Sequence, residues 1–275
     1  MTLPDQTLRE RLAKQEWTAH NIRLSAELTT MPNKPDFVET DMRLHAILRI
    51  LSVFYRGSLA GLRMADLGCL EGGFTLALAQ HRANVVGIEA RQRNIEKCLL
   101  LQEHFELPDS TFLRDDVKNF TREKYGLFDV VMALGILYHL DQPVTWLNQI
   151  ALATKSVLIV ESHYAPVDDD DLALLDPGIS KLDPLESLHA GQLTYLGRWF
   201  TEYVLDTQRE NMLWASYSNK RSFWLTRESL LLAMLRSGFD IVLEEHDYTA
   251  TNYQFYTTTF PRSMFVAVKS DAFKI

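Results

Sequence analysis

One stretch constrains the fold of this chain more than any other: Met64 to Thr75, which reads Met-Ala-Asp-Leu-Gly-Cys-Leu-Glu-Gly-Gly-Phe-Thr. The residues from Gly61 to Ala65 predict the start of a short apolar strand, and those from Phe74 to Gln80 predict a helix, so the glycines lie on a strand-to-helix turn. Glycines let the backbone approach a ligand closely, and the N-terminus of the helix offers free N–H groups and the positive end of its dipole. The turn is therefore a candidate nucleotide site.

The spacing of the glycines separates this turn from a dinucleotide-binding one. A dinucleotide fingerprint reads G-x-G-x-x-G, because its second glycine makes room for the pyrophosphate. Here the turn reads G-x-x-x-G-G, and Leu70 and Glu71 stand where that approach is needed. The Glu71 carboxylate would repel a pyrophosphate. The turn therefore argues against a nicotinamide-dependent dehydrogenase.

An acidic residue ends the next predicted strand. The β-branched run from Asn84 to Ala90 contains Glu89, which lies about 20 positions after Gly68. In α/β nucleotide folds an acid at this distance lies beside the glycine turn, and its two oxygens can accept from both ribose hydroxyls. The alternative is a carboxylate that caps the helix predicted from Arg91 to Phe105. The spacing favours the ribose role.

Two further predicted strands end in candidate ligand-binding residues. Thr111 to Leu113 is followed by Asp115 and Asp116, and Asp116 is placed to accept from the exocyclic amine of adenine. A solvated turn or a helix cap is the alternative there. Gly126 to Leu134 is apolar apart from Asp129, as a buried parallel strand is, and runs into Gly135 to Leu140. Ligands lie beyond the carboxyl ends of parallel strands, so this second turn also faces the ligand.

The order of the elements predicts an α/β fold. A helix begins near Pro143, Ser156 to His163 forms a fifth strand, and strands alternate with helices through short connections, which gives a doubly wound parallel sheet. The chain then ends with a predicted helix, Arg227 to Ser237, and two strands, Asp240 to His246 and Arg262 to Lys269.

Two helices are predicted before the first strand. Apolar residues recur at helical spacing between residues 5 and 30. A second helix, capped by Thr40 or Asp41, ends at Gly57. Its apolar face comprises Leu44, Ile47, Leu48 and Leu51. These helices have no position in the sheet, so they cover an edge of it or close over a site.

Several of these segments resemble motifs I to IV of the class I S-adenosylmethionine-dependent methyltransferases. They are Asp66 to Gly72, Glu89, Asp116, and Phe128 to Val131 with Gly135 to Leu140. Motif I of that family reads D/E-x-G-x-G-x-G, and Leu70 replaces its middle glycine.

A narrower resemblance is to the bacterial tRNA wobble-uridine carboxymethyltransferase group. The stretch from Gly135 to Leu140 is similar to a turn of that group. Ser222 to Leu225 is similar to the Phe-Trp segment that precedes its last helix. Members of that group have a basic RNA-binding surface, whereas this chain is acidic overall.

The family resemblance implies both a fold and a cofactor. The sheet of the family has seven strands in the order 3-2-1-4-5-7-6, with the last strand antiparallel between the fifth and the sixth. The implied cofactor is S-adenosyl-L-methionine, with its amino acid part near Gly68 and Gly72, its ribose at Glu89 and its adenine at Asp116. The cofactor-binding candidates are Asp66, Gly68, Cys69, Gly72, Glu89, Asp116, Val117, Leu134, Gly135 and Leu137.

The resemblance divides the chain into a core and two additions. Residues 58–163 and 226–275 form the cofactor-binding core, 1–57 an N-terminal helical cap, and 164–225 an insert that is longer than an ordinary connection. We expect the insert and the cap to enclose the substrate. The alternative, favoured for Trp199, Phe200 and Tyr203 at near-helical spacing, is that the aromatic residues form a small core of the insert itself. The substrate-binding candidates are Glu161, His189, Tyr195, Arg198, Trp214, Asn219 and Trp224.

Three residues that follow strands are the catalytic candidates: Tyr138, His139 and His163. Methyl transfer depends first on the alignment of the two reactants and then on removal of one proton from a hydroxyl or ammonium acceptor. Each histidine titrates near neutral pH and can take that proton. Tyr138 lines the methyl pocket or packs on the cofactor. For each histidine the alternative is a hydrogen-bonded structural group at the end of a strand.

Composition argues against several kinds of partner. The 275 residues carry 36 acidic and 28 basic side chains, a net charge of −8 that disfavours a broad nucleic-acid-binding surface. Two cysteines and the absence of an H-E-x-x-H spacing give no disulfide framework and no metal site. Residues 1–6 do not read as a signal peptide, and no apolar run reaches the ~18 residues of a membrane span. We expect a cytoplasmic monomer or homodimer.

The leading prediction is an S-adenosylmethionine-dependent methyltransferase that acts on an oxygen or nitrogen atom of a small molecule. Two alternatives stay open: a transferase that modifies the wobble uridine of tRNA, and a non-catalytic member of the fold that binds the cofactor or a partner.

Overall fold

The computed structural model of the protein describes residues 5–172, 182–203, 205–245 and 261–273. The chain divides into two compact units, Met1–Val117 and Lys118–Ile275. The strands of the first unit are β1 (Arg63–Leu67), β2 (Asn84–Glu89) and β3 (Ser110–Arg114). Its helices are α1 (Asp5–Ala13), α2 (Met42–Phe54), α3 (Gly73–Gln80) and α4 (Gln92–Phe105), with a short 3-10 turn, η1 (Val38–Thr40).

The second unit carries the longer strands and the insert. Its main strands are β4 (Phe128–Leu134), β5 (Thr154–His163), β9 (Ile241–Glu245) and β10 (Arg262–Val268), and its smaller ones are β6 (Glu186–Ala190), β7 (Leu193–Thr201) and β8 (Arg221–Leu225). Its helices are α5 (Arg122–Tyr125), α6 (Pro143–Ala153), α7 (Asp169–Leu172), α8 (Asp206–Asn211) and α9 (Arg227–Arg236), with a 3-10 turn, η3 (Leu137–His139), after β4.

The main sheet has the predicted seven strands. Their order is β3-β2-β1-β4-β5-β10-β9. Because β9 and β10 are the sixth and seventh strands of the prediction, this order confirms the predicted 3-2-1-4-5-7-6. β10 runs antiparallel to both of its neighbours, with Phe265 opposite Val160 of β5 and Glu244 of β9. The antiparallel insertion that the family resemblance implied is therefore present.

Parallel pairing and burial define the first unit. β2 pairs in parallel with β1 and with β3, so the carboxyl ends of all three strands lie at one edge. Met64, Ala65 and Leu67 of β1 are inaccessible to solvent. α2 begins after Asp41, whose side chain accepts from the backbone N–H of Arg43, and ends at Phe54, three residues before the predicted end.

The predicted helix over residues 5–30 is wrong beyond its first turns. α1 ends at Ala13, and the following segment is irregular up to η1. Its backbone N–H groups bond to side chains from elsewhere: that of Ile22 donates to Thr30 Oγ1, and those of Thr18 and His20 donate to Glu71. Since these partners satisfy the backbone at least as well as a helix would, helical spacing of apolar residues did not decide the outcome.

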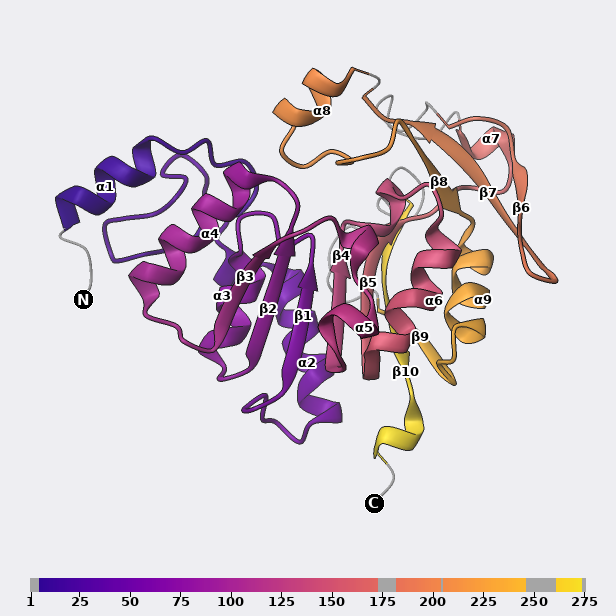
Figure 1. Ribbon diagram of the computed structural model, residues 1–275, viewed down its shortest axis with the longest axis horizontal. Helices are drawn as coiled ribbons and strands as arrows, with labels where there is room; N and C mark the ends of the chain where they lie inside the picture. Colours follow the sequence, from indigo (N-terminus) through magenta and orange to yellow (C-terminus); the bar gives the residue numbers. More distant parts are fainter. Residues whose placement is uncertain (1–4, 173–181, 204, 246–260, 274–275) are drawn as a thin grey trace. The chain divides into compact units, whose positions relative to one another are not determined.

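Continuous apolar sequence gives the second unit its core. β4 and β5 pair in parallel, and Val130 to Ala133 of β4 are fully buried, as the unbroken apolar run predicts. α6 begins with Pro143 in its first turn, as predicted. Figure 1 shows α6 and α9 side by side, and the two helices are in contact.

The insert folds as a small antiparallel sheet, β6-β7-β8. Trp199 and Phe200 lie in β7, so their near-helical spacing was misleading. β8 packs against η3, the turn that follows β4 (Figure 1). Part of the insert is thereby attached to the edge of the sheet at which ligands are expected. The predicted role of residues 164–225 in covering a substrate stays a prediction.

A close approach at Gly197 holds this small sheet together. A Cβ atom there would lie 2.4 Å from the Trp224 carbonyl oxygen and 2.4 Å from the Phe223 ring. We expect Gly197→Ala to destabilise the β7–β8 pairing by about 1–3 kcal/mol, the usual cost of overpacking, and to speed proteolysis of the insert. Urea unfolding and limited proteolysis measure both effects. The exposed Ser187→Ala in β6 is the control, and equal behaviour of the two variants would contradict this account.

Candidate functional site

The glycine turn after β1 adopts the left-handed conformations that its sequence allows. Gly68, Leu70 and Gly72 have φ values of 69°, 52° and 78°. Leu70 therefore adopts a left-handed conformation that glycine tolerates, and for a leucine this costs roughly 1–2 kcal/mol. Gly72 also has no room for a side chain, because a Cβ atom would lie 2.9 Å from the Phe112 ring. The departure at Leu70 leaves the turn intact.

Glu89 lies beside this turn, as the spacing predicts. Its Oε2 accepts from the backbone N–H of Leu70 at 3.1 Å, and its Oε1 accepts from that of Arg91 at 2.8 Å. The residue is 5% exposed, and burial raises the pKa of its carboxyl group. The backbone N–H groups of Gly68 and Cys69 both donate to the carbonyl of Ile88. The acid and the turn therefore form one hydrogen-bonded unit.

The acidic turn after β3 is attached to the same place. The backbone N–H of Asp115 donates to the Glu89 carbonyl at 3.1 Å, so the end of β3 lies next to the end of β2. Asp116 is half-buried, and its N–H donates to Asp115 Oδ1. Val117, also half-buried, begins a 3-10 turn. The structure thus brings Glu89 and the acidic pair together within the first unit.

Asp66 lies near the end of β1, and Cys69 lies in the turn itself. Thr75 donates its hydroxyl hydrogen to Asp66 Oδ2 at 2.6 Å, which ties the end of β1 to the first turn of α3. Burial raises the pKa of Asp66 to about 6. Burial also raises the pKa of the Cys69 thiol. Both residues are buried and pack on the inner side of the turn.

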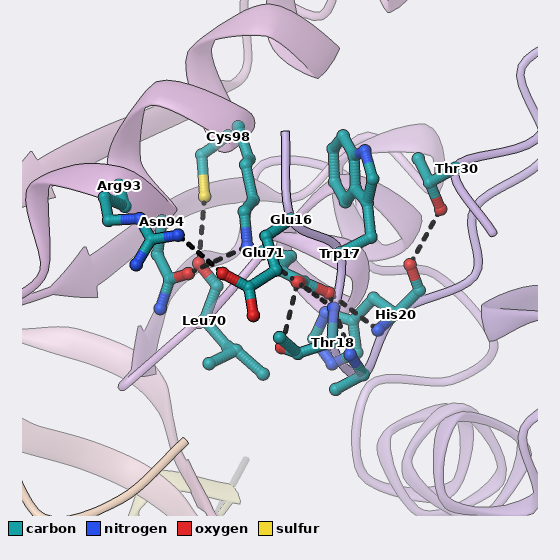
Figure 2. Close-up of polar contacts among 12 residues, drawn as sticks. Glu16, Trp17, Thr18, His20, Thr30, Leu70, Glu71, Arg93, Asn94 and Cys98 are labelled. Atoms are coloured by element: carbon teal, nitrogen blue, oxygen red, sulfur yellow. Dashed lines mark hydrogen bonds and ion pairs between the residues drawn. The ribbon is translucent and has the colours of Figure 1, made fainter. Parts of the chain in front are cut away.

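Sequence analysis gave Glu71 no positive role, yet it has the densest set of polar contacts in the turn (Figure 2). The side chain is fully buried and forms an ion pair with Lys97 of α4 at 2.9 Å. Its two oxygens also accept from the backbone N–H groups of Thr18, Ala19 and His20 and from the Thr18 hydroxyl. Although burial alone would raise it, the pKa of Glu71 is lowered by Lys97 and by these backbone donors. Glu71 thus fastens the irregular N-terminal segment to the glycine turn.

His20, from the same N-terminal segment, contacts the start of α3. Its Nδ1 accepts from the backbone N–H of Gly73, the first residue of α3, at 3.1 Å, and its ring packs edge-on against Phe74. Burial lowers the pKa of His20 to about 4, and the nearby Arg43 and Lys34 act in the same direction against Glu71 and Asp41. The histidine is therefore neutral at physiological pH. It occupies one of the N–H groups that a free helix N-terminus would offer to a ligand.

In the second unit, the turn after β4 is tied to β5. Gly135 has a φ of 73°, and its N–H donates to the Glu161 carbonyl at 2.8 Å. Leu134 stands opposite Glu161 in the parallel register, and Leu137 is buried in η3. The three residues assigned to the cofactor by resemblance therefore lie on one tight turn.

Aromatic rings and one ion pair gather at the end of β5. The rings of His163 and Trp224 stack 5.0 Å apart, and Tyr138 lies edge-on to both. Glu161 is paired with Arg262, whose guanidinium also lies over the Tyr138 ring at 5.5 Å. Burial, followed by the charge of Arg262, lowers the pKa of His163 well below its usual value. A cationic substrate at Glu161 would have to compete with Arg262.

His139 belongs to a second, adjoining set of hydrogen bonds. Its Nδ1 lies 2.8 Å from Oε1 of Glu202, a residue just after β7. The carbonyl of His139 accepts from Asn219 Nδ2 at 2.8 Å. Four of the predicted residues of this unit, Tyr138, His139, His163 and Trp224, are thereby brought together, with Asn219 and Glu161 as their supports.

Four predicted substrate residues lie elsewhere or serve structural roles. His189 is exposed in β6 and contacts Thr194. Tyr195 is buried in β7, and Trp214 is 54% exposed. Arg198 is fully buried and donates to the carbonyls of Pro166, Val167 and Asp183. Its guanidinium also forms an ion pair with Asp169 at 2.8 Å, so Arg198 holds several segments of the insert together.

Sequence reasoning missed Arg262 and Glu202. The prediction that the last strand is antiparallel to the fifth contained a signal for Arg262, since that pairing sets the first residue of β10 opposite His163. Glu202 carried no such signal, because only the folded insert brings it to His139. In the part of the chain that the structure describes, no cluster of His, Cys, Asp and Glu fit for a metal is present. None of the described helices is long and apolar enough to cross a membrane.

Comparison with known proteins identifies relatives of this chain. The sequence model of the family described as "Methyltransferase domain" matches residues 38–244. The chain is 33% identical over 144 residues to the 23S rRNA (uracil(1939)-C(5))-methyltransferase RlmD of Enterobacter sp. (strain 638), across 48% of this chain and 31% of the relative. It is 32% identical over 104 residues to the ubiquinone biosynthesis O-methyltransferase of Pseudomonas aeruginosa (strain UCBPP-PA14), across 37% of this chain and 44% of the relative. The matches thus span less than half the length of these two curated relatives.

A solved structure shares the fold over nearly the whole chain. The N-terminal domain of EvdMO1, crystallised in the presence of SAH and D-fucose, matches with a TM-score of 0.69 at 20% identity, covering 97% of this chain and 97% of that one. The insert and the N-terminal segment are therefore part of an architecture that occurs elsewhere.

The buried Glu71–Lys97 pair predicts a large loss on neutralising the acid. Glu71→Gln keeps the size of the side chain but leaves the Lys97 ammonium buried without its counter-charge. We expect the free energy of unfolding to fall by roughly 3–5 kcal/mol, as for other buried pairs with one partner removed. Urea unfolding measures it. Glu16→Gln, which removes the exposed pair with Arg93, is the control and should cost less than about 1 kcal/mol. A similar small loss for Glu71→Gln would contradict the assigned role.

The depressed pKa of His20 predicts a pH dependence of stability. The unfolded chain binds a proton at His20 near pH 6.5, whereas the folded chain binds it only near pH 4, so acid favours unfolding between these values. We expect the stability advantage of the wild type over His20→Asn to shrink by about 3 kcal/mol from pH 7.5 to pH 4.

Urea unfolding of both proteins across this pH range is the measurement. The asparagine oxygen can still accept from Gly73, so the variant keeps the hydrogen bond and loses the titration. Asp66 titrates in the same range with the opposite sign, but it is present in both proteins and cancels in the difference. A pH-independent difference would show that His20 is not buried in its neutral form.

Proposed function

The chain belongs to the methyltransferase-domain family, and on this premise we propose that it transfers a methyl group from S-adenosyl-L-methionine to an oxygen or nitrogen atom of a small molecule. The observation that carries the proposal is the hydrogen-bonded unit of the glycine turn and Glu89. It joins a backbone able to approach a ligand closely with an acid at the end of the neighbouring strand.

The residues of the first unit fit such a cofactor. An ionised carboxylate has about four acceptor positions. Glu89 uses two of them on the N–H groups of Leu70 and Arg91 and a third on the Asn94 side chain, so one position is left for a ribose hydroxyl. Gly68 and Gly72 would approach the amino acid part, and the acidic turn at Asp116 would meet the adenine.

The chemistry asks little of the protein beyond alignment and proton removal. The cofactor supplies an electrophilic methyl group on its sulfonium. The chain holds the acceptor in line with that methyl and excludes water, and alignment of this kind is worth roughly 7–11 kcal/mol in favourable cases. A hydroxyl or ammonium acceptor must also lose a proton. Tyr138, His139 and His163 lie together in the second unit and are the candidates for this part of the reaction.

Two observations favour a small acceptor. The net charge of −8 is unsuited to holding a polyanion. The relative from Pseudomonas aeruginosa is named as an O-methyltransferase of ubiquinone biosynthesis, which fits an oxygen acceptor on a small molecule.

The second candidate function is modification of a uridine in RNA, with the tRNA wobble base as the specific case. The relative from Enterobacter, named for a uracil of 23S rRNA, favours it, as does the similarity of Gly135 to Leu140 to the tRNA-modifying group. Filter binding of tRNA over a range of salt concentrations separates the two candidates. Tight binding that weakens steeply with salt would support modification of RNA, and absence of binding would remove the tRNA wobble base as the target.

Calorimetry with S-adenosylhomocysteine tests the cofactor assignment. We expect the wild type to bind and Glu89→Ala to bind about 10- to 100-fold more weakly, because hydrogen bonds to a charged group contribute about 1.5–3 kcal/mol. Glu103→Ala, an exposed change on α4, is the matched control. Absence of heat with the wild type, or equal affinity of Glu89→Ala, would contradict the assignment.

A panel of hydroxyl and amine acceptors with labelled cofactor then tests turnover. Methyl transfer by the wild type supports the enzyme. Binding of the cofactor without transfer to any member of the panel, or to tRNA, would favour a non-catalytic member of the fold.

A further inference from the structure

We propose that Glu202 is a positioning residue for methyl transfer: it holds His139 in the tautomer whose Nε2 lone pair removes the proton from the acceptor. The inference rests on the proposed function and assigns a role to a residue that the sequence did not single out. It starts from the contact between Glu202 Oε1 and His139 Nδ1 at 2.8 Å.

The surroundings of this contact determine the state of both groups. The Glu202 side chain is 4% exposed and that of His139 is 17% exposed, so the pair is largely shielded from water. Ser222 donates its hydroxyl hydrogen to the same Oε1 at 2.9 Å. Oε1 of Glu202 is therefore an acceptor, and an ionised carboxylate offers acceptors only. The His139 nitrogen that faces it must then carry the hydrogen.

That hydrogen bond fixes the tautomer of the imidazole. With Nδ1 protonated, Nε2 has the lone pair and is the basic atom of the ring. Among the described residues, no hydrogen bond to Nε2 is found. The side chain therefore keeps its basic atom available while Glu202 occupies the other.

Hydrogen bonds also fix the backbone around His139. The His139 carbonyl accepts from Asn219 Nδ2 at 2.8 Å and from Ser216 Oγ at 3.3 Å. The carbonyl of the next residue, Leu140, accepts from the backbone N–H of Phe223 at 2.8 Å. All of these donors come from residues 216–223 of the insert. The insert thus clamps the turn after β4, and Glu202, from the same insert, orients the ring.

His163, the other histidine of the cluster, is less suited to the task. Its Nε2 lies 3.5 Å from an Arg262 nitrogen, and burial and that cation keep the ring neutral. Taking up a proton there would set two positive charges side by side. His139 instead has the Glu202 carboxylate 2.8 Å from its Nδ1, which stabilises the imidazolium that forms.

The step balances as a single displacement. The acceptor O–H or N–H bond breaks, and its hydrogen becomes bonded to His139 Nε2. The electron pair left on the acceptor forms the new bond to carbon, the carbon–sulfur bond of the sulfonium breaks, and its electrons stay on sulfur. Glu202 remains ionised throughout and bonds to Nδ1–H before and after.

Two-bond ¹H–¹⁵N correlation spectra of protein labelled with ¹⁵N-histidine test the positioning role without an acceptor. At a pH where the ring is neutral, we expect the His139 signals to show a protonated Nδ1 and an unprotonated Nε2, with His139→Gln providing the assignment. Glu202→Ala should shift the population toward the Nε2–H tautomer, and Glu202→Gln should shift it less. The exposed Glu228→Gln should leave it unchanged.

The outcomes separate this proposal from the proposed function. A Nδ1–H tautomer that persists in Glu202→Ala would overturn the positioning role, whatever the wild type binds. On the acceptor found with the panel, Glu202→Ala should lower kcat by roughly 100-fold, the lower end of a general-base contribution, and Glu202→Gln by less, with the KM for the acceptor and the affinity for S-adenosylhomocysteine unchanged. An unaltered kcat, or a loss confined to KM, would also overturn it.

Discussion

The ionised Glu71 carboxylate, buried within the glycine turn, is the interaction on which the first unit depends. An acid cannot remain charged in a protein interior without compensation. Lys97 supplies the opposite charge, and three consecutive backbone N–H groups of the N-terminal segment supply the hydrogen bonds. The result is that the turn, the helix after it and a segment some 50 residues earlier in the chain form one structure. The Glu71 charge, which argued against a dinucleotide ligand, thus stabilises the glycine turn.

The second unit applies the same principle at two further places. Glu161 is compensated by Arg262 across the antiparallel pairing of β5 and β10. Glu202 is compensated by donors from His139 and Ser222. In each case the carboxylate joins segments far apart in the sequence. Burying each of these carboxylates costs free energy unless a partner compensates its charge. The compensated carboxylates thereby fix the positions of the loops at the ends of the strands.

Local patterns in the sequence predicted the scaffold well because their physical causes are local. The apolar run from Val130 to Leu134 is typical of a buried strand, and the aspartate before Met42 caps its helix, whereas the antiparallel insertion at the end of the chain was implied by the family resemblance. The predictions failed where a residue distant in the sequence supplied the hydrogen-bonding partner in place of a local one. Residues 14–30 do not form the expected helix because their backbone bonds to Glu71 and Thr30, and Trp199 and Phe200 lie in a strand because β8 pairs with β7.

The sequence by itself therefore determined where the strands, the glycine turn and the acid beside it lie along the chain, since each depends on residues close together in the chain or on the period of apolar side chains. The order of the strands in the sheet was implied by the family resemblance. Only the tertiary structure decided that His139 lies beside a carboxylate and His163 beside an arginine. It also decided that Arg198, a predicted substrate-binding residue, donates hydrogen bonds to carbonyls of the insert. The physical reason is that hydrogen bonds and charges act through space at a few ångströms, and sequence distance carries no information about which groups will come that close.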